Sequence, residues 1–199
     1  GAGAGETPSS ALVLAALRSL TLKFNTASEV DSFNSQGPAI EDEQGSFQLS
    51  QVFVDAYENS PVFRKHLDDI IDTGIRIIAD RYPYEGPFTP GRQYSRKDAS
   101  RLLNWRKNMY STIYGYKVDS ETNTCPIFVT LHKSDEVSAS TDYEDELIDS
   151  QTMLWYTRSR TSLATTEVTQ IVENAVDIHV FSKKSDADGP GHYYLGRAT

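Results

Sequence analysis

The segment Pro126-Ile-Phe-Val-Thr-Leu-His132 alternates its side chains between two faces, which is the pattern of a β-strand in a packed sheet. The candidate strand within it is Ile127–His132. Further candidate strands lie on both sides of it, at Thr112–Val118, Met153–Arg158, Ile178–Ser182 and Tyr193–Gly196. Between the second and third of these, Thr166–Asn174 has the apolar spacing of a helix. The sequence therefore predicts a mixed domain in which strands dominate and short helices flank the sheet.

The start of this domain is predicted at Tyr82–Gly91, a stretch that contains three prolines and two glycines. After it, Ser95-Arg-Lys-Asp98 has the form of a capping box, because an acid follows the serine by three residues. A short helix over Arg96–Trp105 is expected there. We place the mixed α/β domain at residues 82–199. Its last segment, 193–195, has the pattern of a strand without a closing element, so we expect the domain to continue past Thr199.

Residues 9–80 are predicted to form a helical segment that packs on, or links to, the mixed domain. Three helices are expected, at Ala11–Leu22, Ser50–Asn59 and Pro61–Asp80. Pro61 suits the first turn of its helix, with Ser60 as the N-cap. The polar and acidic stretch Asn25–Gly45 is predicted to be a loop. Residues 1–8, which begin with Gly-Ala repeats, are interpreted as a linker.

The chain has 199 residues, a net charge of -9 and one cysteine, Cys125. The negative charge argues against non-specific coating of DNA, so any contact with nucleic acid must come from a local patch. A single cysteine excludes an internal disulfide and a cysteine-based zinc site. We expect Cys125 to be a buried structural thiol and the protein to be cytoplasmic. The longest apolar run, Ala11–Leu17, is too short to span a membrane.

Basic and aromatic residues are concentrated between Tyr94 and Arg160. The first cluster contains Arg92, Arg96, Lys97, Arg101, Arg106 and Lys107, interleaved with Tyr94, Trp105, Tyr110, Tyr114 and Tyr116. The second is Trp155-Tyr156-Thr157-Arg158-Ser159-Arg160. This combination is typical of a surface that contacts phosphates and stacks on bases, although a solvated helix face over core aromatics has the same pattern.

The aromatic residues differ in what their positions predict. Trp105 is expected in the core. Tyr114 and Tyr116 share one face if they lie on a strand, and that face is either the core or a binding surface. Trp155 and Tyr156 would point to opposite faces of a strand, so at most one of them is expected in any one pocket.

The sequence has no phosphate-binding glycine loop with lysine, no serine nucleophile elbow and no zinc-binding histidine pair. The acidic run Asp142–Glu146 is the only dense group of carboxylates, and Lys133 is near it in sequence. A metal-dependent nuclease would need such a set, but a solvated acidic segment has the same composition. His132 and His192 are expected to make local hydrogen bonds rather than to act as acids or bases.

Seven ordered motifs together resemble one bacterial family. They are Tyr94–Asp98, Leu102–Trp105, Ile113–Tyr116, Ile127–Lys133, Tyr143–Glu146, Trp155–Arg160 and Tyr193–Gly196. The family is a C-terminal domain of unknown function in DEAD/DEAH-box helicase-like proteins, and the resemblance covers about residues 82–197. Some members are similar to the target-recognition part of SauUSI-type Type IV restriction enzymes, which cut DNA that carries methylated or hydroxymethylated cytosine.

The resemblance implies an α+β fold, with an N-terminal helical segment followed by a curved mixed β-sheet or partial barrel of the SRA/PUA-like kind. It also implies a DNA-recognition module, without catalysis of its own, that reads 5-methylcytosine or 5-hydroxymethylcytosine by base flipping. No metal or cofactor is expected. Partners would be double-stranded DNA and the helicase and nuclease domains of the same polypeptide, with no membrane.

Site residues follow from the chemistry of such a reader, which needs flat walls, an acceptor for the cytosine amine and cations for the DNA backbone. Candidate base-binding residues are Tyr114, Tyr116, Tyr143, Asp145, Trp155 and Tyr156. Candidate backbone contacts are Arg96, Lys97, Arg101, Lys133, Arg158 and Arg160. Two alternatives remain: a non-catalytic docking or regulatory module of a helicase-nuclease, and a metal-dependent nuclease that uses Asp142, Glu144, Asp145 and Lys133.

Overall fold

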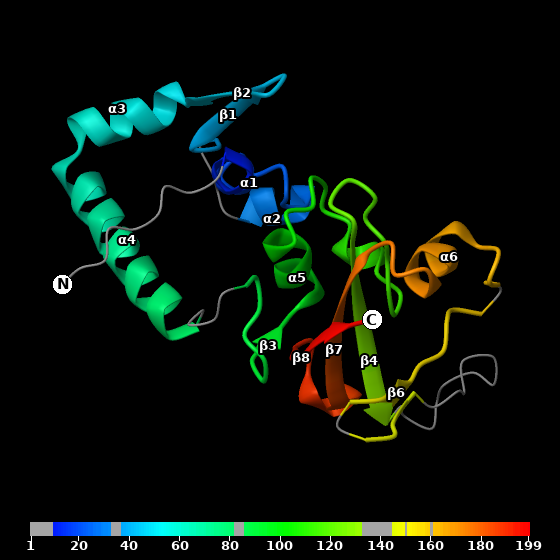
Figure 1. Ribbon diagram of the computed structural model, residues 1–199. Helices are drawn as coiled ribbons and strands as arrows, with labels where there is room; N and C mark the ends of the chain where they lie inside the picture. The colour runs from blue at the N-terminus through cyan, green and yellow to red at the C-terminus, as the bar shows by residue number, and fades with distance from the viewer. Residues whose placement is uncertain (1–9, 33–36, 82–85, 133–144, 150, 160) are drawn as a thin grey trace. The chain divides into compact units, whose positions relative to one another are not determined.

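The computed structural model describes residues 10–32, 37–81, 86–132, 145–149, 151–159 and 161–199 (Figure 1). The chain divides into two compact units. The first comprises Gly1–Asp80 and Arg106–Asn108, and the second comprises Arg81–Trp105 and Met109–Thr199.

The first unit contains four helices and a β-hairpin among its described residues. In chain order these are α1 (Ser10–Ser19), α2 (Ala27–Ser32), β1 (Ile40–Glu43), β2 (Ser46–Leu49), α3 (Gln51–Asn59) and α4 (Pro61–Arg81). The predicted Ser60 cap is present, since Ser60 Oγ accepts from the Phe63 N–H at 3.2 Å. Ser50, predicted as the first residue of its helix, is instead the N-cap of α3, and its Oγ accepts from the Phe53 N–H at 3.3 Å. No helix in the described parts of the chain is both long and apolar enough to cross a bilayer.

The loop predicted over Asn25–Gly45 is wrong. Helix α2 forms there because Thr26 and Glu29 make a reciprocal capping box, in which each side chain accepts a hydrogen bond from the other residue's backbone N–H. The hairpin forms because Gln44 and Gly45 both have positive φ, 54° and 94°, as a tight turn between twisted antiparallel strands requires.

The second unit is built on a four-stranded mixed sheet with the order β3-β8-β7-β4 (Figure 1). Its strands are β3 (Gln93–Tyr94), β4 (Thr124–His132), β7 (Asp177–Ser185) and β8 (His192–Ala198). Strands β4 and β7 are parallel and the other pairs are antiparallel. The sheet curls into a half-barrel, with a register shift at Val180/Phe181 of the kind that increases twist. The predicted α+β class with a curved, partly closed sheet is confirmed.

Short elements surround this sheet. They are α5 (Arg96–Leu102), η1 (Tyr110–Thr112), the strand pair β5 (Glu146–Leu147) and β6 (Met153–Leu154), α6 (Thr166–Val172) and η2 (Asp186–Asp188). The capping box of Ser95 and Asp98 is present at the start of α5. Both α5 and α6 end before the predicted residue, because Asn104 and Asn174 adopt left-handed conformations with φ of 61° and 52°.

The sheet separates two packed layers. On one face, apolar side chains of β4 and β7 pack with Val168 and Ile171 of α6. On the other face, Phe128 stacks on Phe181 at 4.7 Å between ring centroids, and Phe88 packs edge-on against Phe181 at 4.9 Å. The alternation within β4 therefore supplies both layers, as the sequence predicts.

Two core predictions are confirmed. Trp105 is buried, and its Nε1–H donates to Thr124 Oγ1 at 2.9 Å. Cys125 is completely buried, and this burial raises the pKa of its thiol to about 12, which leaves it protonated and unreactive.

The strand predicted at Thr112–Val118 is wrong. The segment begins with η1 and continues through isolated bridges, because Gly115 adopts φ of 78° and reverses the backbone. Tyr114 is consequently 69% exposed, whereas Tyr116 is 1% exposed, so the two rings do not share a face. The strand predicted at Met153–Arg158 is confirmed only for Met153–Leu154.

Candidate functional site

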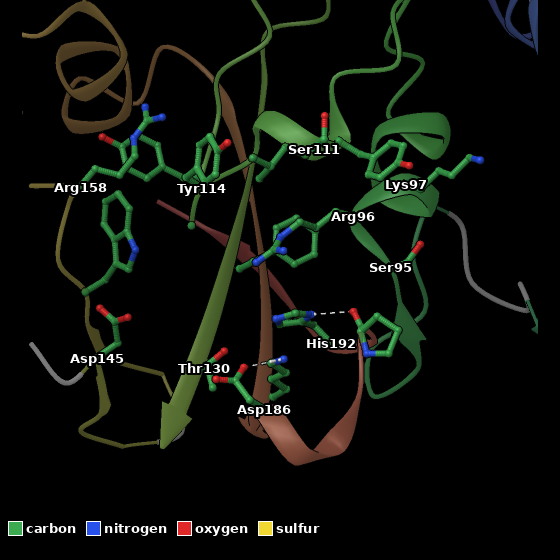
Figure 2. Close-up of a pocket in the computed structure, with 18 of the residues that line it drawn as sticks. Ser95, Arg96, Lys97, Ser111, Tyr114, Thr130, Asp145, Arg158, Asp186 and His192 are labelled. Atoms are coloured by element: carbon green, nitrogen blue, oxygen red, sulfur yellow. Dashed lines mark hydrogen bonds and ion pairs between the residues drawn. The ribbon is translucent and has the colours of Figure 1, made fainter. Parts of the chain in front are cut away.

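The second unit contains a pocket of about 830 Å³, within the size range of ligand-binding clefts. Its floor is formed by Phe128 and Thr130 of β4, the last strand in the sheet order. The turn at Gly115 runs along the outer edge of this strand, where the Gly115 carbonyl oxygen accepts from the Phe128 N–H at 2.6 Å. Figure 2 shows Asp145 and Arg158 on one side of the pocket, with Arg96, Lys97 and His192 on the other.

The wall that contains Arg158 is aromatic. The Trp155 ring packs edge-on against Tyr116 with centroids 5.0 Å apart. The Arg158 guanidinium lies over the Tyr116 ring, 4.3 Å from its centroid, and forms an ion pair with Glu167 at the start of α6. Arg158 is therefore held in place by a stacking contact and an ion pair at once.

Asp145 supplies the acidic group of this wall. Its side chain is buried, and Oδ1 accepts from the Tyr156 backbone N–H at 2.9 Å. Among the described residues no other hydrogen bond to this carboxylate is present. A buried carboxylate with spare acceptor capacity at the side of a pocket can accept from an amine of a ligand.

The opposite wall is cationic and polar. The Arg96 guanidinium lies over Phe128, with its Cζ 5.6 Å from the ring centroid. Partial burial lowers the pKa of this guanidinium, and the negative charge of Asp186 acts in the opposite direction. Lys183 is buried, and its Nζ contacts Asp186 Oδ1 at 2.9 Å and the Gly189 carbonyl oxygen at 3.1 Å. His192 Nδ1 lies 3.2 Å from the Pro190 carbonyl oxygen. Burial, followed by the charges of Lys183 and Arg96, lowers the pKa of His192 to about 4.

Three buried polar atoms around the pocket have no hydrogen-bond partner within the described parts of the chain. They are Tyr116 Oη, Arg158 Nε and His192 Nε2. Buried polar atoms are nearly always hydrogen-bonded in folded proteins, and an exception points to a water or ligand that completes the site. A cleft that combines such unpartnered donors and acceptors with exposed aromatic side chains has the properties of a binding site.

Residues 88–199 match a family model described as Domain of unknown function (DUF3427). The match covers more than half of the 199 residues. The chain belongs to this family. Residues 4–82 match a second model, described as Domain of unknown function (DUF8090). No curated protein matches the chain.

Most of the predicted site residues come together in the pocket of the DUF3427 domain. Its lining includes Tyr114, Tyr116, Asp145, Trp155 and Tyr156 from the predicted base-binding set, and Arg96, Lys97 and Arg158 from the predicted backbone set. Arg101 is half-buried on α5 and does not line the pocket. Tyr143, Lys133 and Arg160 lie outside the described residues.

The expectation that only one of Trp155 and Tyr156 lines a given pocket is wrong for the DUF3427 domain. Strand β6 ends at Leu154, so strict alternation does not apply to the following residues, and both side chains line the pocket. For His192, the predicted local hydrogen bond is present, whereas its place in the pocket wall was not predicted from the sequence. Phe128, Thr130, Lys183 and Asp186 were also missed. The first three reach the pocket through the pairing of strands far apart in sequence, and Asp186 lies in η2, directly after β7.

The nuclease alternative depends mainly on residues outside the described ranges, since Asp142, Glu144 and Lys133 lie there and Asp145 alone is described. Within the described ranges of the chain, no group of three or more His, Cys, Asp or Glu side chains is placed to hold a metal ion.

Proposed function

We propose that the DUF3427 domain of this chain is the DNA-binding target-recognition module of a modification-dependent restriction enzyme. In this proposal it binds double-stranded DNA, flips a modified cytosine, 5-methylcytosine or 5-hydroxymethylcytosine, into the pocket, and leaves catalysis to helicase and nuclease domains elsewhere in the polypeptide. The observation that supports it best is the coincidence of exposed aromatics, cations and unpartnered buried polar atoms around one cleft.

The aromatic residues are suited to receive a base. Tyr114 and Tyr156 are exposed at the pocket, and Trp155 is partly buried beside them. Extrusion of a base from duplex DNA costs a few kcal/mol, and stacking on an aromatic side chain returns about 1–3 kcal/mol per base. Stacking on two of these rings would therefore offset the cost of flipping.

The polar groups match the edge of cytosine. Its exocyclic amine donates, and the Asp145 carboxylate is a buried acceptor. Its ring nitrogen and carbonyl oxygen accept, and the unpartnered Arg158 Nε–H and Tyr116 hydroxyl are donors. The pocket thus offers an acceptor and two donors on the same wall as the aromatic rings.

Cations at the pocket provide the contact with the DNA backbone. Arg96 is partly desolvated at the pocket but remains accessible to solvent, and Lys97 Nζ lies 5.7 Å from the Tyr110 ring centroid. Because the whole chain has a net charge of -9, binding should depend on these local charges and weaken strongly as salt is raised.

A titration of the chain with three matched duplexes, containing cytosine, 5-methylcytosine or 5-hydroxymethylcytosine at one position, tests the proposal. We expect a modified duplex to bind at least about tenfold more tightly, which corresponds to roughly 1.4 kcal/mol. A mismatch opposite the modified base should strengthen binding further, since less pairing is lost on flipping. Equal affinity for all three duplexes would refute modified-base recognition.

Matched variants separate the pocket from the rest of the surface. Tyr156→Ala should remove the preference for the modified base, whereas Tyr193→Ala should retain it. Tyr156 and Tyr193 are 44% and 47% exposed, but Tyr193 does not line the pocket. Lys97→Ala should weaken binding to all duplexes, with the exposed Lys184→Ala as its control.

A docking role is the second candidate, and helix α4 of the first unit favours it. Ile70, Ile71, Ile75 and Ile78 are all more than half exposed along this helix. Exposed apolar side chains in such density on one helix are typical of a surface that another protein covers. Absence of DNA binding under all conditions would favour this role.

A further inference from the structure

Arg96, in the wall of the pocket opposite Asp145, is assigned above to the DNA backbone, but the other polar groups of this wall have no assigned task. We call its polar groups the His192 corner, which consists of Arg96, Thr130, Lys183, Asp186 and His192. We propose that the His192 corner binds a hydroxyl group carried by the modified base, so that the domain prefers 5-hydroxymethylcytosine, or a glycosylated form of it, over 5-methylcytosine. This inference rests on the proposed function.

The hydrogen bond made by His192 Nδ1 determines whether the other ring nitrogen, Nε2, is a donor or an acceptor. The Pro190 carbonyl oxygen can only accept, so the proton of the imidazole is on Nδ1, 3.2 Å away. The pKa of about 4 keeps the ring neutral at physiological pH. Nε2 therefore has a lone pair and requires a hydrogen-bond donor.

No described neighbour donates to Nε2. Lys183 Nζ contacts Asp186 and the Gly189 carbonyl oxygen instead, and Arg96 lies over the Phe128 ring. Nε2 has no partner among the described residues, although His192 is only 2% exposed. An unsatisfied buried acceptor destabilises the folded domain, and a ligand with a suitably placed donor would remove that cost.

The chemistry of the corner selects a hydroxyl over the other groups of a modified nucleotide. A methyl group cannot donate and would leave Nε2 unsatisfied. A backbone phosphate diester has no proton to donate and would meet the carboxylate of Asp186. A hydroxyl donates to Nε2 and accepts from Arg96, which lies beside His192 in Figure 2.

The size of the pocket agrees with a ligand larger than a methylated base. Its volume of about 830 Å³ lies in the upper part of the range of about 300–1,000 Å³ found for ligand pockets. A methylcytosine ring held against Trp155 and Asp145 would fill only part of it. The remaining space lies over β4 and extends to the His192 corner, where a hydroxymethyl group or an attached sugar would be placed.

The test is a binding titration of the chain with four matched duplexes that contain cytosine, 5-methylcytosine, 5-hydroxymethylcytosine or glucosylated 5-hydroxymethylcytosine. We expect at least one hydroxyl-bearing duplex to bind about tenfold more tightly than the 5-methylcytosine duplex. The tighter of the two hydroxyl-bearing duplexes identifies the source of the hydroxyl.

His192→Phe removes the acceptor and keeps an aromatic ring against Phe128, which His192 contacts edge-on at 5.1 Å. The variant should bind the hydroxyl-bearing duplexes and the 5-methylcytosine duplex with about equal affinity. It should still bind the 5-methylcytosine duplex more tightly than the cytosine duplex. His192→Gln, whose amide oxygen can accept at the position of Nε2, should restore part of it. His179→Phe is the matched control, because His179 is also a buried histidine on the aromatic face but does not line the pocket.

The outcomes separate this inference from the proposed function. If 5-methylcytosine binds as tightly as both hydroxyl-bearing bases, the inference is overturned and modified-base recognition stands. If no modified duplex exceeds unmodified DNA, both fail. If the hydroxyl preference persists in a folded His192→Phe variant, His192 does not read the hydroxyl. The wild-type comparison decides the question even if a variant fails to fold.

Discussion

Acidification should destabilise the second unit through its two buried histidines. His179 and His192 are 5% and 2% exposed, and both have a pKa lowered to about 4 from the ordinary value of 6.5, with burial as the largest cause. In the unfolded chain each imidazole takes up a proton as the pH falls through 6.5, whereas the folded form takes it up only near 4. The unfolded state therefore binds more protons in this interval, and stability falls as the pH decreases.

The magnitude follows from the interval between the unfolded pKa and the chosen pH. At about pH 5 that interval is about 1.5 units, and each unit corresponds to 1.36 kcal/mol, so each histidine removes about 2 kcal/mol of unfolding free energy relative to pH above 7. The two together remove about 4 kcal/mol, a large fraction of the stability of a typical domain.

Urea unfolding followed by tryptophan fluorescence measures this effect. Both tryptophans, Trp105 and Trp155, belong to the second unit, so the signal reports on that unit. His179→Gln should lower the loss of free energy between about pH 7.5 and about pH 5 by roughly half, because one of the two titrating groups is removed. The reasoning is refuted if the wild type and His179→Gln lose the same free energy over this range.

Three further predictions concern the elements that hold the pocket. Ser95→Ala should lower stability by about 1 kcal/mol in chemical denaturation, because the N-cap acceptor of α5 is lost, and Ser95→Asp should retain most of it. Gly115→Ala should lower the free energy of unfolding by about 1–2 kcal/mol, because φ of 78° is strained for alanine. Gly74→Ala within α4 should leave stability unchanged or raise it. Equal melting temperatures for the two variants would contradict this prediction. Cys125 should react with a thiol reagent only as fast as the second unit unfolds, and rapid labelling under native conditions would show that the site opens locally.

The sequence predicts the parts of this fold that depend on local chemistry. The capping box of Ser95 and Asp98 and the Ser60 cap of α4 need only residues within one turn, and both form. The alternation of side chains in β4 also correctly predicts that both faces of this strand are packed. The capping box of Thr26 and Glu29 has the same kind of local signal, and the acidic composition of the surrounding segment obscured it.

Predictions based on strand periodicity were wrong where a single residue interrupted the backbone. The rule that alternate residues share a face requires an unbroken extended backbone. Gly115 breaks that condition between Tyr114 and Tyr116, and the end of β6 at Leu154 breaks it before Trp155. In each case the aromatic residue types pointed to a candidate site, but the direction of each ring depends on φ angles that the residue types do not determine.

The His192 corner shows why the rest of the pocket could not be predicted. His192 and Lys183 belong to β8 and β7, and Phe128 belongs to β4, so they meet only through a register that pairs Phe128 with Phe181 and Phe181 with Tyr194. Nothing local marks His192 as a pocket residue, because the sequence around it predicts no more than a hydrogen bond to a nearby carbonyl. The strand pairing then buries its second nitrogen without a partner among the described residues. The discrimination of a hydroxyl from a methyl group that we propose would therefore arise from the tertiary structure and not from a motif.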